Sequence, residues 1–136
     1  MFAEPLVKWS THDRFAVHLW LGEIVATAGL VLLIFGLNRA GRAHLAPVAV
    51  ASYIGAAYWF TSSTSFANPA VTVGRAFTDT FAGTAPASVA PFVVAQLVGA
   101  VVGLGLVVAV FGRPAPAGTS VPVPHGVAES VAPAAP

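Results

Sequence analysis

Three long runs of apolar residues dominate the chain, and polar or charged residues lie almost entirely between them. The runs cover residues 18–37, 45–63 and 89–111. The first contains one acid, Glu23, and the other two contain no charged residue. Each run approaches the roughly 20 residues that cross about 30 Å of hydrocarbon as an α-helix. The pattern therefore predicts an all-α membrane protein with three transmembrane helices.

The composition excludes several classes of function. Apolar residues make up 57% of the sequence and charged residues 8%, against about 25% charge in soluble domains. A net charge of +1 without a basic stripe gives no reason to expect nucleic-acid binding. There is no cysteine, no histidine and acid cluster with metal-site spacing, and no nucleophile paired with a base. We therefore expect no enzyme, no metal and no cofactor.

The polar segments predict how the chain is oriented in the cell membrane. Residues 1–17 are mixed in sign, which predicts a loop or tail at the membrane surface. The turn at 38–44 contains two arginines, one histidine and no acid, and short basic loops stay in the cytoplasm. We therefore expect the N-terminus and the connection at 64–88 outside, and the C-terminus in the cytoplasm.

The last segment, residues 112–136, differs in composition from the apolar runs. It holds six of the eleven prolines, together with Ala, Val, Ser and Gly. Such a segment cannot bury enough apolar surface to offset the entropy of ordering. We predict a disordered Pro/Ala-rich tail.

Small residues recur in the third run, where Gly99 and Gly103 are four positions apart. In lipid, small residues at this spacing let two helix backbones approach closely. The spacing predicts a helix contact, and the general tolerance of glycine in membrane helices is the alternative explanation.

Residues 65–79, SFANPAVTVGRAFTD, are too polar to face lipid and too helix-like to form a plain loop. Asn is a good N-cap and Pro is favoured at the first helical position, so Asn68-Pro69 predicts a helix start. A helix from 69 to about 78 would be roughly 15 Å long, half a bilayer. Irregular backbone at membrane depth is tolerated only where it is buried in protein or lines a cavity. We predict a re-entrant loop and half-helix over 64–79, which is a pore element.

With these features, residues 18–111 resemble the C-terminal half of the aquaporin, or major intrinsic protein, family. The matching residues are Glu23, Thr27 and Leu30, the tripeptide Asn68-Pro69-Ala70 with Gly74, and the stretch AQLVGAVVG at 95–103. The valine after the tripeptide is similar to the bacterial aquaglyceroporin-like branch. The resemblance implies half of the aquaporin fold, with the three runs as the family's fourth, fifth and sixth helices.

The resemblance also implies roles for individual residues. Asn68 would present its side-chain amide to solutes in single file, while the dipole of the half-helix repels protons and other cations. Pro69 and Ala70 would stack against the same tripeptide of the other half. Glu23 would accept hydrogen bonds from backbone N–H groups of the re-entrant loop. A proton-carrying role is the alternative for this intramembrane acid.

The selectivity filter departs from that of water-selective family members. These place Arg directly after the tripeptide and tend to place His twelve residues before its Asn, where this chain has Val71 and Ala56. Ser65 falls where the resemblance implies another small filter residue. The wider, less polar constriction would suit glycerol-like polyols, urea or metalloid acids such as arsenous acid. Arg75, one helical turn after Val71, either guards the outer vestibule or reaches lipid headgroups.

The number of spans limits what the chain can do by itself. A full family member has six spans and two half-helices in inverted repeats, whereas this sequence predicts three spans and one half-helix. One half-helix cannot close a pore. We expect a fragment of a longer parent chain or one partner of a split channel. A homodimer would need opposite insertion of its two copies, which the basic turn disfavours.

The sequence is compatible with two functions. The first is a channel, or half of one, for passive transport of water and small neutral solutes such as glycerol or metalloid acids. The second is a truncated, non-conducting membrane subunit or gene fragment that keeps only the packing of the fold. The expected partners are membrane lipid, small neutral solutes, and a complementary half-channel or a longer parent chain, and a homo-oligomer is a further option.

Overall fold

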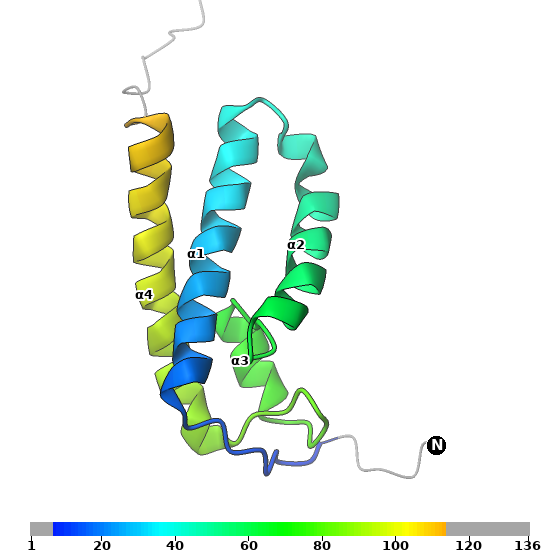
Figure 1. The fold of residues 1–136 in the computed structure, drawn as a ribbon. Coiled ribbons are helices and arrows are strands. Elements are labelled where there is room, and N and C mark those ends of the chain that lie inside the picture. Colours follow the sequence, from blue (N-terminus) through cyan, green and yellow to red (C-terminus); the bar gives the residue numbers. More distant parts are fainter. Residues whose placement is uncertain (1–6, 114–136) are drawn as a thin grey trace, which may run out of the picture.

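Helices form all the regular structure of residues 7–113, the part of the chain that a computed structural model describes. The predicted all-α class is therefore confirmed for this part. The predicted tail lies outside it except for its first two residues. Three longer helices run side by side, and a short one lies near the end that holds the N-terminal segment (Figure 1). The elements are α1 (Val17–Arg39), η1 (Ala43–Leu45), α2 (Ala46–Phe60), α3 (Pro69–Arg75) and α4 (Pro86–Phe111).

Two of the helices, α1 and α4, are long and apolar enough to cross a membrane. The third predicted span is shorter, because α2 has 15 residues and a length of roughly 22 Å. It ends at Phe60, three residues before the end expected from the apolar run, because Thr61 is already extended with φ −114° and ψ 144°. The residues after it form an irregular loop instead of a last helical turn.

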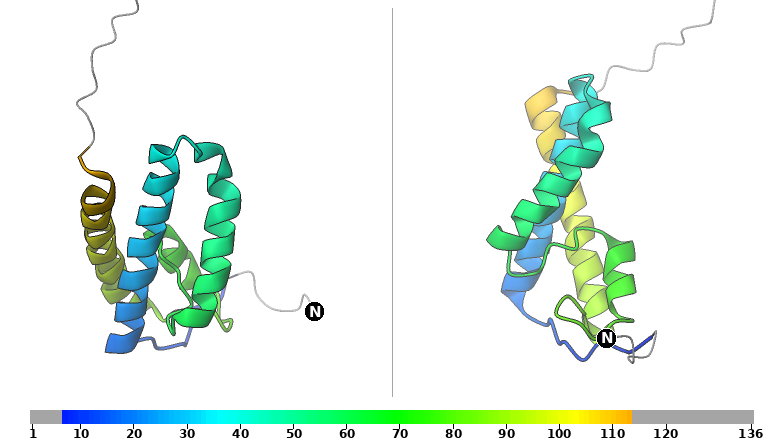
Figure 2. Two further views of the ribbon diagram at one scale, coloured as in Figure 1. Left: turned by 45° about the horizontal axis from the view of Figure 1, so that its top comes forward. Right: turned by 90° about the vertical axis from the view of Figure 1, so that its right-hand side faces the viewer.

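The main helix contact joins α1 and α4, which lie against each other in all views (Figures 1 and 2). Glycines make this close approach possible. A Cβ added to Gly99 would lie 2.6 Å from the carbonyl oxygen of Ile24, and one added to Gly103 would lie 2.7 Å from that of Ala28. Both distances are shorter than van der Waals contact, so the contact predicted from the glycine spacing is confirmed.

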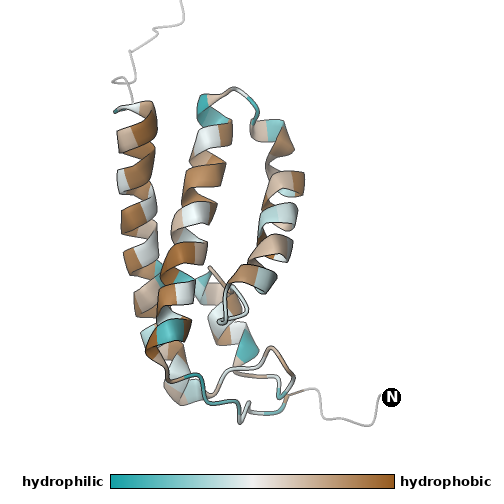
Figure 3. Cartoon of the chain, viewed as in Figure 1, coloured by the Kyte–Doolittle hydropathy of each residue, from teal (hydrophilic) through white to brown (hydrophobic). Residues whose placement is uncertain are grey.

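Apolar residues predominate along the long helices (Figure 3). Val101 and Val110 on α4 are 71% and 64% exposed, whereas Glu23 and Gln96 are 0% and 1% exposed. A soluble domain rarely exposes so much contiguous apolar surface. Lipid is the solvent that suits such an outer face.

The short helix α3 packs against α4 and ends at Arg75, earlier than the expected end near residue 78. Its last turn tightens there, because the N–H of Phe77 donates to the carbonyl of Gly74, three residues earlier, at 3.2 Å. The N-terminal segment then binds the residues that follow: the backbone N–H of Ser10 donates to the carbonyl of Ala76 at 3.0 Å, and that of Lys8 donates to the carbonyl of Phe77 at 3.1 Å.

Replacing Gly99 or Gly103 with alanine is expected to destabilise the fold. The added methyl group would push α1 and α4 apart, and such overpacking costs about 1–3 kcal/mol. Gly105→Ala is the matched control on the same helix, because nothing lies within 4 Å of a Cβ added there. Denaturant unfolding in detergent micelles measures the difference. Equal stability of all three variants would contradict the close contact.

Candidate functional site

The carboxylate of Glu23 lies fully buried on α1 and holds the loop that precedes α3. Its Oε1 accepts a hydrogen bond from the backbone N–H of Phe66 at 3.0 Å, and its Oε2 accepts one from that of Ala67 at 2.9 Å. A third donor is the side-chain Nε2 of Gln96 on α4, 2.7 Å from Oε2. These contacts to the loop backbone are the ones that the family resemblance implies for Glu23.

Gln96 extends the network of Glu23 to α3. Its Nε2 also donates to Oγ1 of Thr72 at 2.8 Å, and the Thr72 hydroxyl donates to the backbone carbonyl of Asn68 at 3.0 Å. One chain of hydrogen bonds therefore joins α1, α4 and the first turn of α3. No role was predicted for Gln96 from the sequence. One feature of the sequence could have indicated this role: Gln96 is a lone amide in an uncharged apolar run, and polar side chains often join membrane helices.

The loop at 61–67 has an unusual backbone. Thr64, Ser65 and Ala67 have φ values of 66°, 48° and 47°, although residues other than glycine rarely adopt positive φ. Such conformations persist where surrounding contacts fix them. Here Glu23 holds two of the loop's N–H groups, and the Ser63 hydroxyl accepts a hydrogen bond from the N–H of Ser65 at 3.2 Å.

Asn68 caps α3, as the Asn-Pro pair predicts. Its side-chain Oδ1 accepts a hydrogen bond from the N–H of Ala70 at 2.8 Å, and Pro69 occupies the first helical position. The cap engages the oxygen of the amide, so the Nδ2 group is directed elsewhere. All three residues of the tripeptide are exposed in the described part of the chain.

The predicted filter residues differ in exposure. Val71 on α3 is 40% exposed and Ala56 on α2 is also exposed, whereas Ser65 is 2% exposed and its hydroxyl bonds to that of Thr61. No contact joins α2 to α3, so the structure does not bring Ala56 and Val71 together. Arg75 is partly exposed at the end of α3, and its side chain makes no hydrogen bond within residues 7–113.

Arg14 contacts the same region and was not predicted from the sequence. Its Nε donates to the carbonyl of Gly83 at 2.7 Å, and its two terminal nitrogens donate to those of Phe81 at 2.9 Å and Ser63 at 3.2 Å. Burial lowers the pKa of the guanidinium, and the charge of Glu23 opposes this shift. Its partners are 49 to 69 residues away, which no local pattern could indicate.

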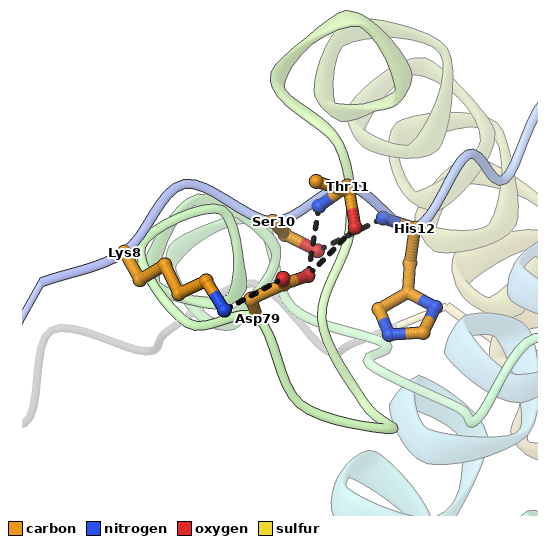
Figure 4. Close-up of polar contacts among 5 residues, drawn as sticks. All are labelled: Lys8, Ser10, Thr11, His12 and Asp79. Carbon is orange, nitrogen blue, oxygen red and sulfur yellow. Dashed lines mark hydrogen bonds and ion pairs between the residues drawn. The ribbon is translucent and has the colours of Figure 1, made fainter. Parts of the chain in front are cut away.

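The N-terminal segment is fastened over this end of the molecule (Figure 4). The backbone N–H and the hydroxyl of Thr11 donate to Oδ1 of Asp79 at 2.9 and 3.0 Å, and the ammonium of Lys8 lies 3.4 Å from Oδ2. The N–H of His12 donates to Oγ of Ser10 at 3.3 Å. The hydrogen bonds from Thr11 lower the pKa of Asp79.

Together the fold and the site define an all-helical membrane protein with a polar interior and a loop held by a buried carboxylate. Comparison with known proteins relates it to a family. The chain is 48% identical over 106 residues to the aquaglyceroporin AqpS of Rhizobium meliloti (strain 1021). The similarity relates the chain to the aquaporin, or major intrinsic protein, family, as its motifs predict. The match covers 78% of this chain and 45% of the relative, so this chain spans about half of the relative's length. No family model and no solved structure matches.

Replacing Glu23 tests the network directly. In Glu23→Leu, three buried N–H donors lose their acceptor, at roughly 1–3 kcal/mol each. Glu23→Gln keeps one oxygen and is expected to be milder. Thr27→Val is the matched control on α1, because the buried Thr27 hydroxyl has no partner within residues 7–113. Denaturant unfolding in micelles should rank the leucine variant lowest, and wild-type stability in both Glu23 variants would disprove the bracing role.

The attachment of the N-terminal segment is expected to depend on pH through Asp79. Its pKa is lower in the folded protein than the value of about 3.9 in an unfolded chain. The contribution of the Asp79 carboxylate to holding the segment is therefore present above the unfolded pKa and is lost as the pH falls through the folded pKa. The protection factor of the Thr11 amide, measured by hydrogen exchange, should decrease as the pH falls through the folded pKa of Asp79. Asp79→Asn should remove this dependence, and a pH-independent wild type would contradict it.

Proposed function

We propose that the chain is half of a membrane pore for water and small neutral solutes. The observation that carries the proposal is the buried network of Glu23, which fixes an irregular loop and a short helix against two apolar helices. A pore needs irregular backbone at membrane depth, and such backbone is stable only where protein contacts satisfy its polar groups. The name of the relative, an aquaglyceroporin, supports the same function.

The positions of the contacts support a re-entrant arrangement with three spanning segments. Glu23 lies six residues after the start of α1 and Gln96 ten residues after the start of α4, which correspond to about 9 and 15 Å along each helix. The start of α3 is bonded at this depth, and half of a hydrocarbon core is about 15 Å. We propose that α2, with η1 and the residues around Thr61, forms the third span.

The solutes follow from the groups at the start of α3. Asn68 uses its Oδ1 as a cap, so its Nδ2 hydrogens are directed elsewhere and are suited to donate to a hydroxyl group in the passage. Val71 and Ala56 add no charge and little volume. We propose that glycerol-like polyols, urea or arsenous acid pass together with water. Ions are excluded, because the free energy lost when an ion is stripped of its hydration in a low-dielectric passage exceeds the free energy of its interaction with the amide of Asn68.

The basic residues support an orientation with the N-terminus outside and the C-terminus in the cytoplasm. Arg39 donates hydrogen bonds to the carbonyls of Phe111 and Gly112, both at 3.0 Å, so the basic turn and the end of α4 share one end of the molecule. Arg42 and Arg113 lie in the same two segments. Cytoplasmic loops are enriched in such residues.

The other half of the pore must come from elsewhere. Because α2 contacts neither α3 nor α4, the exposed sides of these helices are open to further protein. We propose that a complementary half-channel, or the rest of a longer parent chain, covers them, while lipid covers the outer faces. The alternative, a non-conducting subunit that keeps only the packing, predicts no solute flux with any partner. Further copies of this chain could assemble around the completed pore.

Val71→Arg tests the proposed pore. Proteoliposomes would hold this chain alone, or together with the first half of the aquaglyceroporin relative. The added guanidinium should narrow the passage and slow glycerol and arsenous acid more than water in swelling assays. Val73→Arg is the matched control, because it adds the same charge to another face of α3. Equal glycerol rates in both variants would place Val71 outside the constriction, and no flux in any wild-type pair would favour the non-conducting subunit.

A further inference from the structure

We propose that Arg14 is a positioning residue of the pore, which with Glu23 clamps the 61–67 loop from two sides and so sets which solutes pass. The inference rests on the proposed function for its consequence, while the clamp itself rests on contacts within this chain. Arg14 belongs to the polar N-terminal segment, outside the apolar runs and the tripeptide.

Phe66 lies at the centre of the clamp and is 5% exposed. Its backbone N–H donates to Oε1 of Glu23 at 3.0 Å. Its ring lies below the guanidinium of Arg14, with Cζ 5.4 Å from the ring centroid, and is 5.7 Å from the ring of Phe92 on α4. A cation at this distance from an aromatic face is attracted by the ring. The acid and the base therefore hold one residue of the loop between them.

The guanidinium of Arg14 joins the loop to a second segment. One terminal nitrogen donates to the carbonyl of Ser63 inside the loop, while Nε and the other terminal nitrogen donate to the carbonyls of Gly83 and Phe81. A planar guanidinium presents several N–H groups in a fixed fork, whereas lysine has one compact ammonium. Lysine at position 14 would keep the charge, but its three N–H groups share one nitrogen and would not match carbonyls that three separate nitrogens of Arg14 reach.

The two charged groups hold opposite kinds of backbone atoms. Arg14 binds a carbonyl at Ser63, and Glu23 binds the N–H groups of Phe66 and Ala67. Two of the residues with positive φ, Thr64 and Ser65, lie between these attachment points. Backbone in this region relaxes when its surroundings release it. Removing Arg14 would free one end of the loop and change the course of the backbone that leads into Asn68.

Hydrogen exchange tests the clamp without any solute. The variants Arg14→Gln and Arg14→Lys would be compared with wild type in lipid nanodiscs. Lys8→Gln is the matched control, because Lys8 lies in the same segment and, among residues 7–113, its side chain pairs only with Asp79. Both Arg14 variants should raise exchange at the Phe66 and Ala67 amides about ten- to hundredfold, the range for losing charged hydrogen bonds. Amides of α1 and α4 should keep their protection.

Swelling assays test the consequence for selectivity. In the completed pore, both Arg14 variants should change the ratio of glycerol to water permeability, and Lys8→Gln should leave it at the wild-type value. A wild-type ratio in Arg14→Lys would overturn the proposal, since charge alone would then suffice. Unchanged exchange at Phe66, or a uniform increase over all helices, would overturn it as well. If the wild-type pair passes no solute, the proposed function fails, and the exchange measurement alone decides the clamp.

Discussion

The structure depends on one carboxylate that accepts three hydrogen bonds inside an apolar helix pair. A buried acid is costly unless donors surround it, and the donors around Glu23 come from the loop backbone and from α4. Each donor would in turn be unsatisfied without the acid. These hydrogen bonds hold the 61–67 loop in a backbone conformation that its residues would not adopt alone.

The close contact of α1 and α4 makes this arrangement possible. Gly99 and Gly103 let the two backbones approach so closely that no Cβ would fit, and this brings Gln96 within reach of Glu23. In lipid, apolar side chains gain little by packing against each other, so close backbone approach and polar contacts must hold the helices together. Close backbone approach at the two glycines and the polar contact of Gln96 both occur within two helical turns of the interface between α1 and α4.

The end of the molecule that holds the N-terminal segment is stabilised by charged groups together with the packing of Trp9 against Phe77. Arg14 binds backbone carbonyls of the 76–85 connection, and Asp79 of that connection binds Thr11 and Lys8 of the N-terminal segment. Protein contacts therefore cover this end of the described chain, whereas the sides of α2 and α3 are exposed. That asymmetry is expected of one part of a pore whose remaining wall comes from other protein.

Local patterns in the sequence determined the helices, the start of α3 at Asn68-Pro69 and the acid that lies inside. These features depend on runs of apolar residues, on capping and on glycine spacing, which neighbouring residues specify. Only the tertiary structure decided that α2 ends at Phe60, that α3 ends at Arg75, and that Gln96 and Arg14 hold the loop. The conformation of the loop after α2 and the contacts of Gln96 and Arg14 depend on hydrogen bonds to groups far away in the sequence, and no local pattern encodes such partners.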